Sequence, residues 1–216
     1  EILFQLLRSL EDLPIHVDYL LSGATIITMN PVREILENAS IAIKGSKIAW
    51  IGDTKDVTRQ FDAKHSLDCT GKLIMPGLIN VHGHWAMTLF RGMVDDITLE
   101  GWLAKVWKAE AAYMTEENVI AGAQLAMMEM IRSGTTCAAD MYWHYRASTE
   151  AARRAGFRMV NGPSFAEIEG FKEYRHTNQE IALAYLDEYK DIPLVHLCVQ
   201  AHSAYTTNPE LLQIVS

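Results

Sequence analysis

The chain has 216 residues, of which 49% are hydrophobic and 21% are charged, and its formal net charge is −8. This composition predicts a folded domain with a packed core and excludes a disordered segment. The negative charge argues against sequence-independent nucleic-acid binding, which requires clustered lysine and arginine side chains. Small molecules are therefore the expected partners.

The cysteines and the hydropathy pattern bear on where such a protein works. Cys69, Cys137 and Cys198 form no CxxC pair, so neither a disulfide framework nor a cysteine-built zinc site is predicted, and a reducing cytoplasm fits this pattern. No apolar run approaches the ~20 residues that span a bilayer. Residues 1–14 have apolar positions at helical spacing but no basic leader, which predicts a short docking helix or an ill-ordered arm.

The N-terminal third has the pattern of short strands. The segments Asp18–Met29 and Ala39–Ile51 are rich in apolar residues, and Asn30-Pro31 and Gly45 supply turn signals. A change of pattern at Pro76-Gly77 marks a domain boundary. We therefore predict an N-terminal arm and a small β-sandwich-type subdomain over residues 1–76.

From residue 77 onward, short apolar strands alternate with helical stretches. The expected strands are Leu78–His84, Thr135–Met141, Met159–Gly162 and Leu194–Ala201. The expected helices are Glu116–Arg132 with Thr115 as its N-cap, one capped by Ser148 that stops at Gly156, one from Asn178 to Tyr189, and one that opens at Asn208-Pro209.

Four strand–helix units in series predict parallel strands joined by right-handed crossovers. A complete (β/α)8 barrel needs about 250 residues. Residues 77–216 therefore correspond either to the N-terminal part of a TIM barrel, with about four βα units, or to a small doubly wound α/β domain.

A histidine pair carries the clearest chemical signal. In the segment MPGLINVHGH, His82 and His84 are two residues apart at the end of the first predicted strand, so their side chains should project to the same face. Barrels of this class place their active sites at this end of the strands. A bare HxH pair is more often surface or core, but this setting favours a ligand pair for Zn²⁺, with Fe²⁺ as the alternative.

The segment PGLINVHGHWAMTLFRGMVDDITLEGWL resembles the first strand and loop of the amidohydrolase superfamily. Further similarity lies in SIAIKGSKIAWIG, RSGTTCAADMYWH and QAHSAYT, in the same order along the chain. Together these segments resemble the branch of methylthioadenosine/S-adenosylhomocysteine deaminases, whose relatives include guanine deaminases and triazine hydrolases. The resemblance implies a metal-dependent hydrolase that acts on a nucleoside-like small molecule.

The resemblance also implies roles for particular residues. His82 and His84 match two of the family's metal ligands, whereas the fifth-strand His, the eighth-strand Asp and the family's proton-transfer residues match nothing in this sequence. The resemblance thus places no catalytic residue within this chain. His202 resembles a His that faces the substrate, with a structural histidine as the alternative. Glu110 resembles the acid that binds the ribose hydroxyls, with an ordinary surface glutamate as the alternative.

The pocket walls and the substrate are less sharply defined. Trp85 and Trp102 are expected to wall the pocket by stacking, although loop packing explains either residue nearly as well. Asp140 fits a role in orienting a ligand histidine or a turn. Some relatives place an arginine after the third strand to hold a substrate carboxylate. The stretch from Asn161 to Phe165 contains none, which favours a methylthioadenosine- or adenosine-like substrate over S-adenosylhomocysteine.

The expected function is hydrolytic deamination of such a nucleoside by the complete enzyme. The alternatives are another amidohydrolase branch, acting on guanine, a pterin or a triazine, and a half-barrel without activity of its own. The partners implied are a homo-oligomer, or a C-terminal half that completes the barrel.

Overall fold

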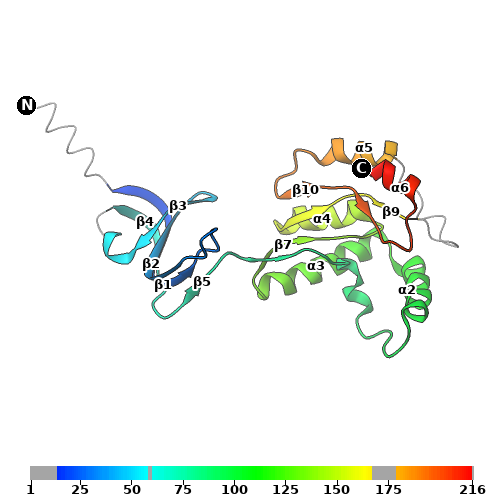
Figure 1. Ribbon diagram of the computed structural model, residues 1–216, viewed down its shortest axis with the longest axis horizontal. Helices are drawn as coiled ribbons and strands as arrows, with labels where there is room; N and C mark the ends of the chain where they lie inside the picture. The colour runs from blue at the N-terminus through cyan, green and yellow to red at the C-terminus, as the bar shows by residue number, and fades with distance from the viewer. Residues whose placement is uncertain (1–13, 58–59, 167–178, 216) are drawn as a thin grey trace, which may run out of the picture. The chain divides into compact units, whose positions relative to one another are not determined.

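The structure is a computed structural model that describes residues 14–57, 60–166 and 179–215 (Figure 1). Residues 1–13 of the predicted arm and the predicted cap Asn178 lie outside these ranges. The chain divides into two compact units, Glu1–Pro76 and Gly77–Ser216. Among the described residues, no helix is both long enough and apolar enough to cross a membrane.

The first unit contains a five-stranded sheet. Its strands are β1 (Ile15–Ile27), β2 (Ile35–Lys44), β3 (Lys47–Asp53), β4 (Phe61–Asp68) and β5 (Leu73–Ile74), with a short 3-10 helix η1 (Thr54–Asp56) after β3. The order is β3-β2-β1-β4, with β5 also paired to β1. β2 lies antiparallel to β1 and β3, whereas β4 and β5 run parallel to β1. The described part of this unit holds this single sheet, so the predicted sandwich stays a prediction.

The second unit is built on a parallel sheet. Its strands are β6 (Leu78–Asn80), β7 (Thr135–Ala139), β8 (Arg158–Asn161) and β10 (Val195–Leu197), in the order β10-β8-β7-β6. Each strand pairs in parallel with its neighbour in this order, as the alternation of strands and helices predicts. A short parallel pair, β9 (Ser164–Phe165) with β11 (Gln200–Ala201), continues beyond β8 and β10.

The helices of this unit connect the strands. They are η2 (Trp85–Phe90), α2 (Leu99–Tyr113), α3 (Glu116–Arg132), α4 (Tyr145–Ala155), α5 (Gln179–Tyr189) and α6 (Pro209–Val215). The bounds of α3 are the predicted ones, and the Thr115 hydroxyl accepts a hydrogen bond from the Asn118 N–H, as an N-cap should.

Two expectations need correction. The first predicted strand ends at Asn80, before the histidine pair, and not at His84. The second predicted helix begins at Tyr145, so Ser148 does not cap it: Ser148 lies within α4 and is fully buried. The helix starts three residues before the predicted cap, after His144, whose side chain makes no capping hydrogen bond.

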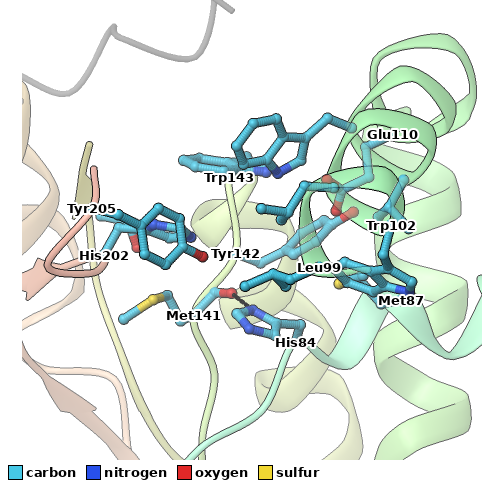
Figure 2. A pocket seen from close by; sticks show the side chains of 14 residues that line it. His84, Met87, Leu99, Trp102, Glu110, Met141, Tyr142, Trp143, His202 and Tyr205 are labelled. Atoms are coloured by element: carbon cyan, nitrogen blue, oxygen red, sulfur yellow. Dashed lines mark hydrogen bonds between the residues drawn. The ribbon is translucent and has the colours of Figure 1, made fainter. Parts of the chain in front are cut away.

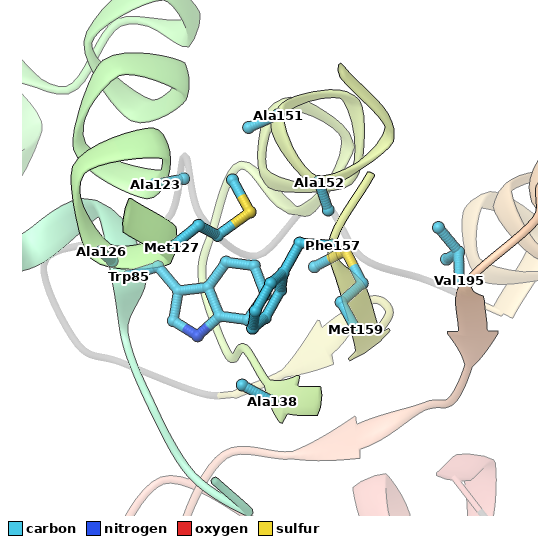
Figure 3. Close-up of a cluster of buried hydrophobic side chains, with 10 residues drawn as sticks. All are labelled: Trp85, Ala123, Ala126, Met127, Ala138, Ala151, Ala152, Phe157, Met159 and Val195. Carbon is cyan, nitrogen blue, oxygen red and sulfur yellow. The ribbon is translucent and has the colours of Figure 1, made fainter. Parts of the chain in front are cut away.

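The largest described core cluster lies under the helices of the second unit (Figure 3). It joins α3 and α4 to the sheet through Met127, Ala151 and Met159, all essentially unexposed. Trp85 and Phe157 meet edge to face within it, with ring centroids 5.8 Å apart. This packing fixes the start of η2, and therefore the chain that carries the histidine pair, against the sheet.

Candidate metal centre and ligand pocket

The histidine pair lies where β6 ends. The Asn80 side-chain oxygen accepts a hydrogen bond from the His82 N–H, at 3.2 Å, and so helps to end the strand. His82 and His84 follow without regular structure, yet their rings lie 4.9 Å apart between centroids and nearly perpendicular, at 89°. The structure thus brings the two predicted ligands together, although they lie in the loop after β6 and not within a strand.

A backbone carbonyl holds the His84 ring. Nδ1 of His84 lies 2.6 Å from the oxygen of Met141, at the end of the neighbouring strand β7. Because a carbonyl only accepts, Nδ1 carries the proton and donates it, which leaves the lone pair of Nε2 free for a metal ion. The Met141 N–H in turn donates to the Gly83 oxygen, at 2.9 Å. These two bonds tie the ligand loop to β7.

Neutral imidazoles held in this way fit a divalent ion such as Zn²⁺. A catalytic zinc site uses three protein ligands and one open position. Within the described ranges, however, no group of three or more histidine, cysteine or acidic side chains could hold a metal ion. The described residues therefore supply two ligands for a site that needs at least three.

Asp140 does not contact the ring of His84. Its Oδ1 accepts a hydrogen bond from the backbone N–H of Trp85, at 2.8 Å, and so fixes the residue that follows His84. Burial raises the pKa of this carboxyl to about 6, while the hydrogen bond from the Trp85 amide acts in the opposite direction. The orienting role expected of the Asp140 side chain belongs to the Met141 carbonyl.

A cavity of about 100 Å³ opens beside His84 (Figure 2). Four of the six predicted site residues line it, namely His84, Trp102, Glu110 and His202. They come from different parts of the second unit: the loop after β6, helix α2 and the loop after β11. Its other walls are largely apolar: Met87, Leu99, Leu103, Val106, Trp107, Met141, Tyr142, Trp143, Ser164 and Tyr205.

Glu110 is buried, with 3% of its surface exposed, so it is not an ordinary surface glutamate. It lies near the end of α2, which begins after Thr98, whose hydroxyl accepts a hydrogen bond from the Gly101 N–H. Burial raises the pKa of the Glu110 carboxyl, and the nearby side chains of Tyr142 and Trp143 oppose this rise. A carboxylate has about four acceptor positions, so Glu110 can accept hydrogen bonds from a ligand.

His202 follows the short strand β11, and its ring stacks on that of Trp143, with centroids 5.4 Å apart and planes 25° from parallel. Burial lowers the pKa of His202, and the electrostatic effect of the nearby His84 and His82 acts in the same direction. The ring is therefore held neutral near the cavity, where it can exchange hydrogen bonds with a ligand.

Trp85 is not part of the cavity wall. Its side chain is 3% exposed and packs in the core cluster against Phe157, so the expectation that it walls the pocket is not met. The reason is geometric: η2 starts at Trp85 and turns the residue toward α3 and the sheet. Trp102, one turn into α2, does line the cavity.

Comparison with known proteins identifies the family to which this fold and site belong. Residues 73–216 match the model of the amidohydrolase family. The chain belongs to the amidohydrolase family. It is also 36% identical to a 5-methylthioadenosine/S-adenosylhomocysteine deaminase of Saccharophagus degradans, over 92% of this chain and 45% of that protein. The chain thus spans about half the length of the curated relatives that it matches.

Solved amidohydrolase structures resemble the chain as well. A zinc-bound adenosine deaminase from Xanthomonas campestris matches 94% of the chain, with a TM-score of 0.84 and 29% identity, and 47% of that protein is covered. An atrazine chlorohydrolase from Arthrobacter aurescens, solved with zinc, matches 91% of the chain and is itself covered over 49%, with a TM-score of 0.77. At 22% identity, this second likeness shows the fold alone.

Several residues that line this pocket were not among those predicted from the sequence. Tyr142 and Trp143 lie just beyond the end of β7, act on the pKa of Glu110 and line the cavity, and Tyr205 lies beyond the end of β11. The signal that could have found them is position, because aromatic residues just beyond the carboxyl end of a parallel strand lie where such folds bind ligands. The segment DMYWH met that criterion.

Proposed function

We propose that this chain supplies metal-binding and substrate-binding residues of an amidohydrolase that hydrolytically deaminates an adenosine-like nucleoside. The observation that carries the proposal is the cavity that joins His84, Glu110 and His202, with His82 beside His84. The similarity to proteins named methylthioadenosine/S-adenosylhomocysteine deaminase, and to a zinc-bound adenosine deaminase, supports this substrate class.

The proposal extends to the architecture. We assign residues 77–216 to the first four βα units of a (β/α)8 barrel and residues 1–76 to a β-sandwich-type subdomain. The order β10-β8-β7-β6, parallel throughout, supports the assignment, as does the position of the cavity-lining loops after β6, β7 and β11.

His82 and His84 would hold the metal ion, together with ligands from outside the described residues. Their fit rests on the neutral His84 ring, whose Nδ1–H is committed to the Met141 carbonyl. When bound, a zinc ion would supply a water molecule acidic enough to ionise near pH 7. The chain's own part is to turn the His84 ring, which the bond to the Met141 carbonyl does, and to fix the main chain at His82, whose N–H is bound by Asn80.

The remaining residues would position the nucleoside. Glu110, which lies beside Tyr142 and Trp143, would accept hydrogen bonds from the two ribose hydroxyls. His202 would hydrogen-bond to the base, and Trp102 would present an apolar face to it. The apolar walls would exclude water around the base and so strengthen these polar contacts.

The test is ammonia release from methylthioadenosine by the complete enzyme that contains this chain. We expect His82→Ala to lower kcat/KM by about 100-fold or more, because even residues that only support a metal ligand contribute 10- to 100-fold. His65→Ala, at an exposed position of β4, is the matched control and should leave turnover unchanged. Full turnover by the His82 variant would refute the metal assignment.

A substrate panel separates this proposal from its rivals. Adenosine, methylthioadenosine, guanine, a pterin and a chlorinated triazine would be compared by ammonia or chloride release. Preference for the two nucleosides is expected from Glu110, which has no role in binding a free base. Faster turnover of guanine or the triazine would move the enzyme to another branch of the family.

A further inference from the structure

His202 is held in place by more than its aromatic neighbour. Its backbone N–H donates to the Phe165 oxygen of β9, at 3.0 Å, which fixes the main chain. The Trp143 ring lies parallel to one face, and Tyr205 meets it edge on, with centroids 6.2 Å apart. The plane of the imidazole is therefore set, and the open question is which ring nitrogen carries the proton.

The hydroxyl of Thr206 indicates which ring nitrogen carries the proton. Thr206 is 4% exposed, and its Oγ1 lies 2.7 Å from His202 Nδ1 and 2.7 Å from Ser203 Oγ. Its third neighbour, the Ser203 carbonyl oxygen, is 3.4 Å away, outside the usual range for a hydroxyl donor. That oxygen also accepts shorter bonds, from the Thr206 N–H at 3.2 Å and from the Thr207 hydroxyl at 2.6 Å.

The Thr206 proton thus has two possible acceptors, Nδ1 of His202 and Oγ of Ser203. If it goes to Ser203, then Nδ1 must be the donor to Thr206, and the Ser203 proton is left without an acceptor among the described residues. If it goes to Nδ1, then the Ser203 hydroxyl donates to Thr206, and both hydroxyl protons are used. The second arrangement satisfies more of the polar groups in this half-buried cluster.

We propose that Thr206, supported by Ser203, is a positioning residue that fixes His202 as the Nε2–H tautomer and makes it a hydrogen-bond donor toward the cavity. The chain of donors runs from Ser203 Oγ to Thr206 Oγ1 to His202 Nδ1. The remaining proton, on Nε2, then requires an acceptor from the ligand.

This inference deepens the proposed function and, for the ligand, rests on it. A donor at this point selects a base that presents an unprotonated ring nitrogen, as an adenine ring does. A base that presents an N–H group at the same point would meet a second donor and be rejected. The tautomer itself depends only on the described contacts of His202, Ser203 and Thr206, so it can be tested without turnover.

The experiment is nuclear magnetic resonance of the 216-residue chain with ¹⁵N-labelled histidine rings, freed of metal by EDTA. Long-range ¹H–¹⁵N correlations at about pH 8, above the ordinary histidine pKa of about 6.5, distinguish the two neutral tautomers. His202→Gln identifies the His202 signals by their loss. We expect the Nε2–H pattern for His202 in the wild-type chain.

Two variants separate the hydroxyl from the packing. Thr206→Val keeps the shape but removes the donor, and it should shift His202 toward a mixture of tautomers. Thr206→Ser keeps the hydroxyl and should preserve the Nε2–H pattern. An Nδ1–H pattern in the wild-type chain, or an unchanged pattern in Thr206→Val, would overturn the proposal. Because no step uses activity, either result is independent of whether the enzyme deaminates nucleosides.

Discussion

Glu110 and Asp140 are the buried carboxylates of the described chain, and their surroundings give them different tasks. Asp140 is 1% exposed and accepts the Trp85 backbone N–H, so it fixes the main chain beside His84. Glu110 faces the cavity beside the side chains of Tyr142 and Trp143. Asp140 therefore supports the chain that carries His82 and His84, whereas Glu110 remains able to meet a ligand.

The raised pKa of Glu110 predicts a pH-dependent stability. Burial favours the neutral carboxyl in the folded chain, so the folded state binds the proton more tightly than the unfolded state. The stability that this group contributes is present at low pH and is lost as the pH rises through the folded pKa. Relative to Glu110→Gln, which stays neutral, the wild-type chain should therefore lose stability as the pH rises above the ordinary glutamate pKa of about 4.3.

Urea unfolding of both chains at several pH values measures this difference. Glu100→Gln, at an exposed position of the same helix, controls for the loss of one carboxylate from α2. A difference in free energy between wild type and Glu110→Gln that stays constant, or that grows with pH in favour of the wild type, would contradict the assigned burial.

For single residues, the sequence predicted which residues belong to the site better than it predicted their contacts. His82 and His84 could be selected from their spacing at the end of a predicted strand, and Glu110 and His202 from their resemblance to residues of a known family. That the Met141 carbonyl turns His84, and that Trp85 packs inward, could not be predicted. Both depend on how neighbouring strands align, and a backbone carbonyl leaves no mark in the sequence.

Among the helices, α3 packs closely on η2 at a glycine. A Cβ atom added at Gly122 would lie 2.5 Å from the Ala86 oxygen and 2.9 Å from its Cα, both of them backbone atoms. The Thr88 hydroxyl also donates to the Gly122 oxygen, at 2.8 Å, and ties the two elements together. The glycine thus allows an approach that brings η2, and the chain after His84, onto α3.

Gly122→Ala should therefore destabilise the chain, although alanine is normally the better helix former. Because backbone must shift to admit the methyl group, we expect a loss of about 1–3 kcal/mol in the free energy of unfolding. Gly101→Ala in α2 is the matched control: its Cβ would meet Thr98 Oγ1 at 3.4 Å and Ile97 Cδ1 at 3.5 Å, which are ordinary contacts. It should be neutral or gain about 0.4–1 kcal/mol. If urea unfolding showed that both variants are stabilised equally, the close packing of α3 on η2 would be refuted.

The elements also show which local signals are reliable. The bounds of α3 followed from Thr115, from the acids Glu116 and Glu117 and from the glycine beyond its end, since each of these acts through the helix backbone itself. The start of α4 did not follow, because His144 at its start makes no side-chain capping bond, and Ser148 lies buried inside the helix. Local chemistry thus predicts a helix boundary only where the capping side chain binds the helix backbone itself.

For the molecule as a whole, the division at Pro76 and the parallel sheet order reflect patterns spread over many residues, so they are visible in the sequence. The state of the metal centre depends instead on the number of ligands that one chain brings together. His82 and His84 are adjacent, and the described residues bring no third ligand beside them. His202 contributes to the ligand pocket, where its Nδ1 is engaged by Thr206.

The number of metal ligands predicts how the 216-residue chain behaves by itself. With two ligand histidines it should bind Zn²⁺ at least about 100-fold more weakly than the complete enzyme, since loss of a mere supporting residue already costs 10- to 100-fold. It should also release no ammonia from methylthioadenosine. Isothermal titration with Zn²⁺ measures the affinity, and the double variant His82→Ala/His84→Ala should abolish the weak binding while His65→Ala leaves it intact. Tight zinc binding together with turnover by this chain would show that a third ligand and the proton-transfer groups lie within it. That result would refute the proposed division of the site.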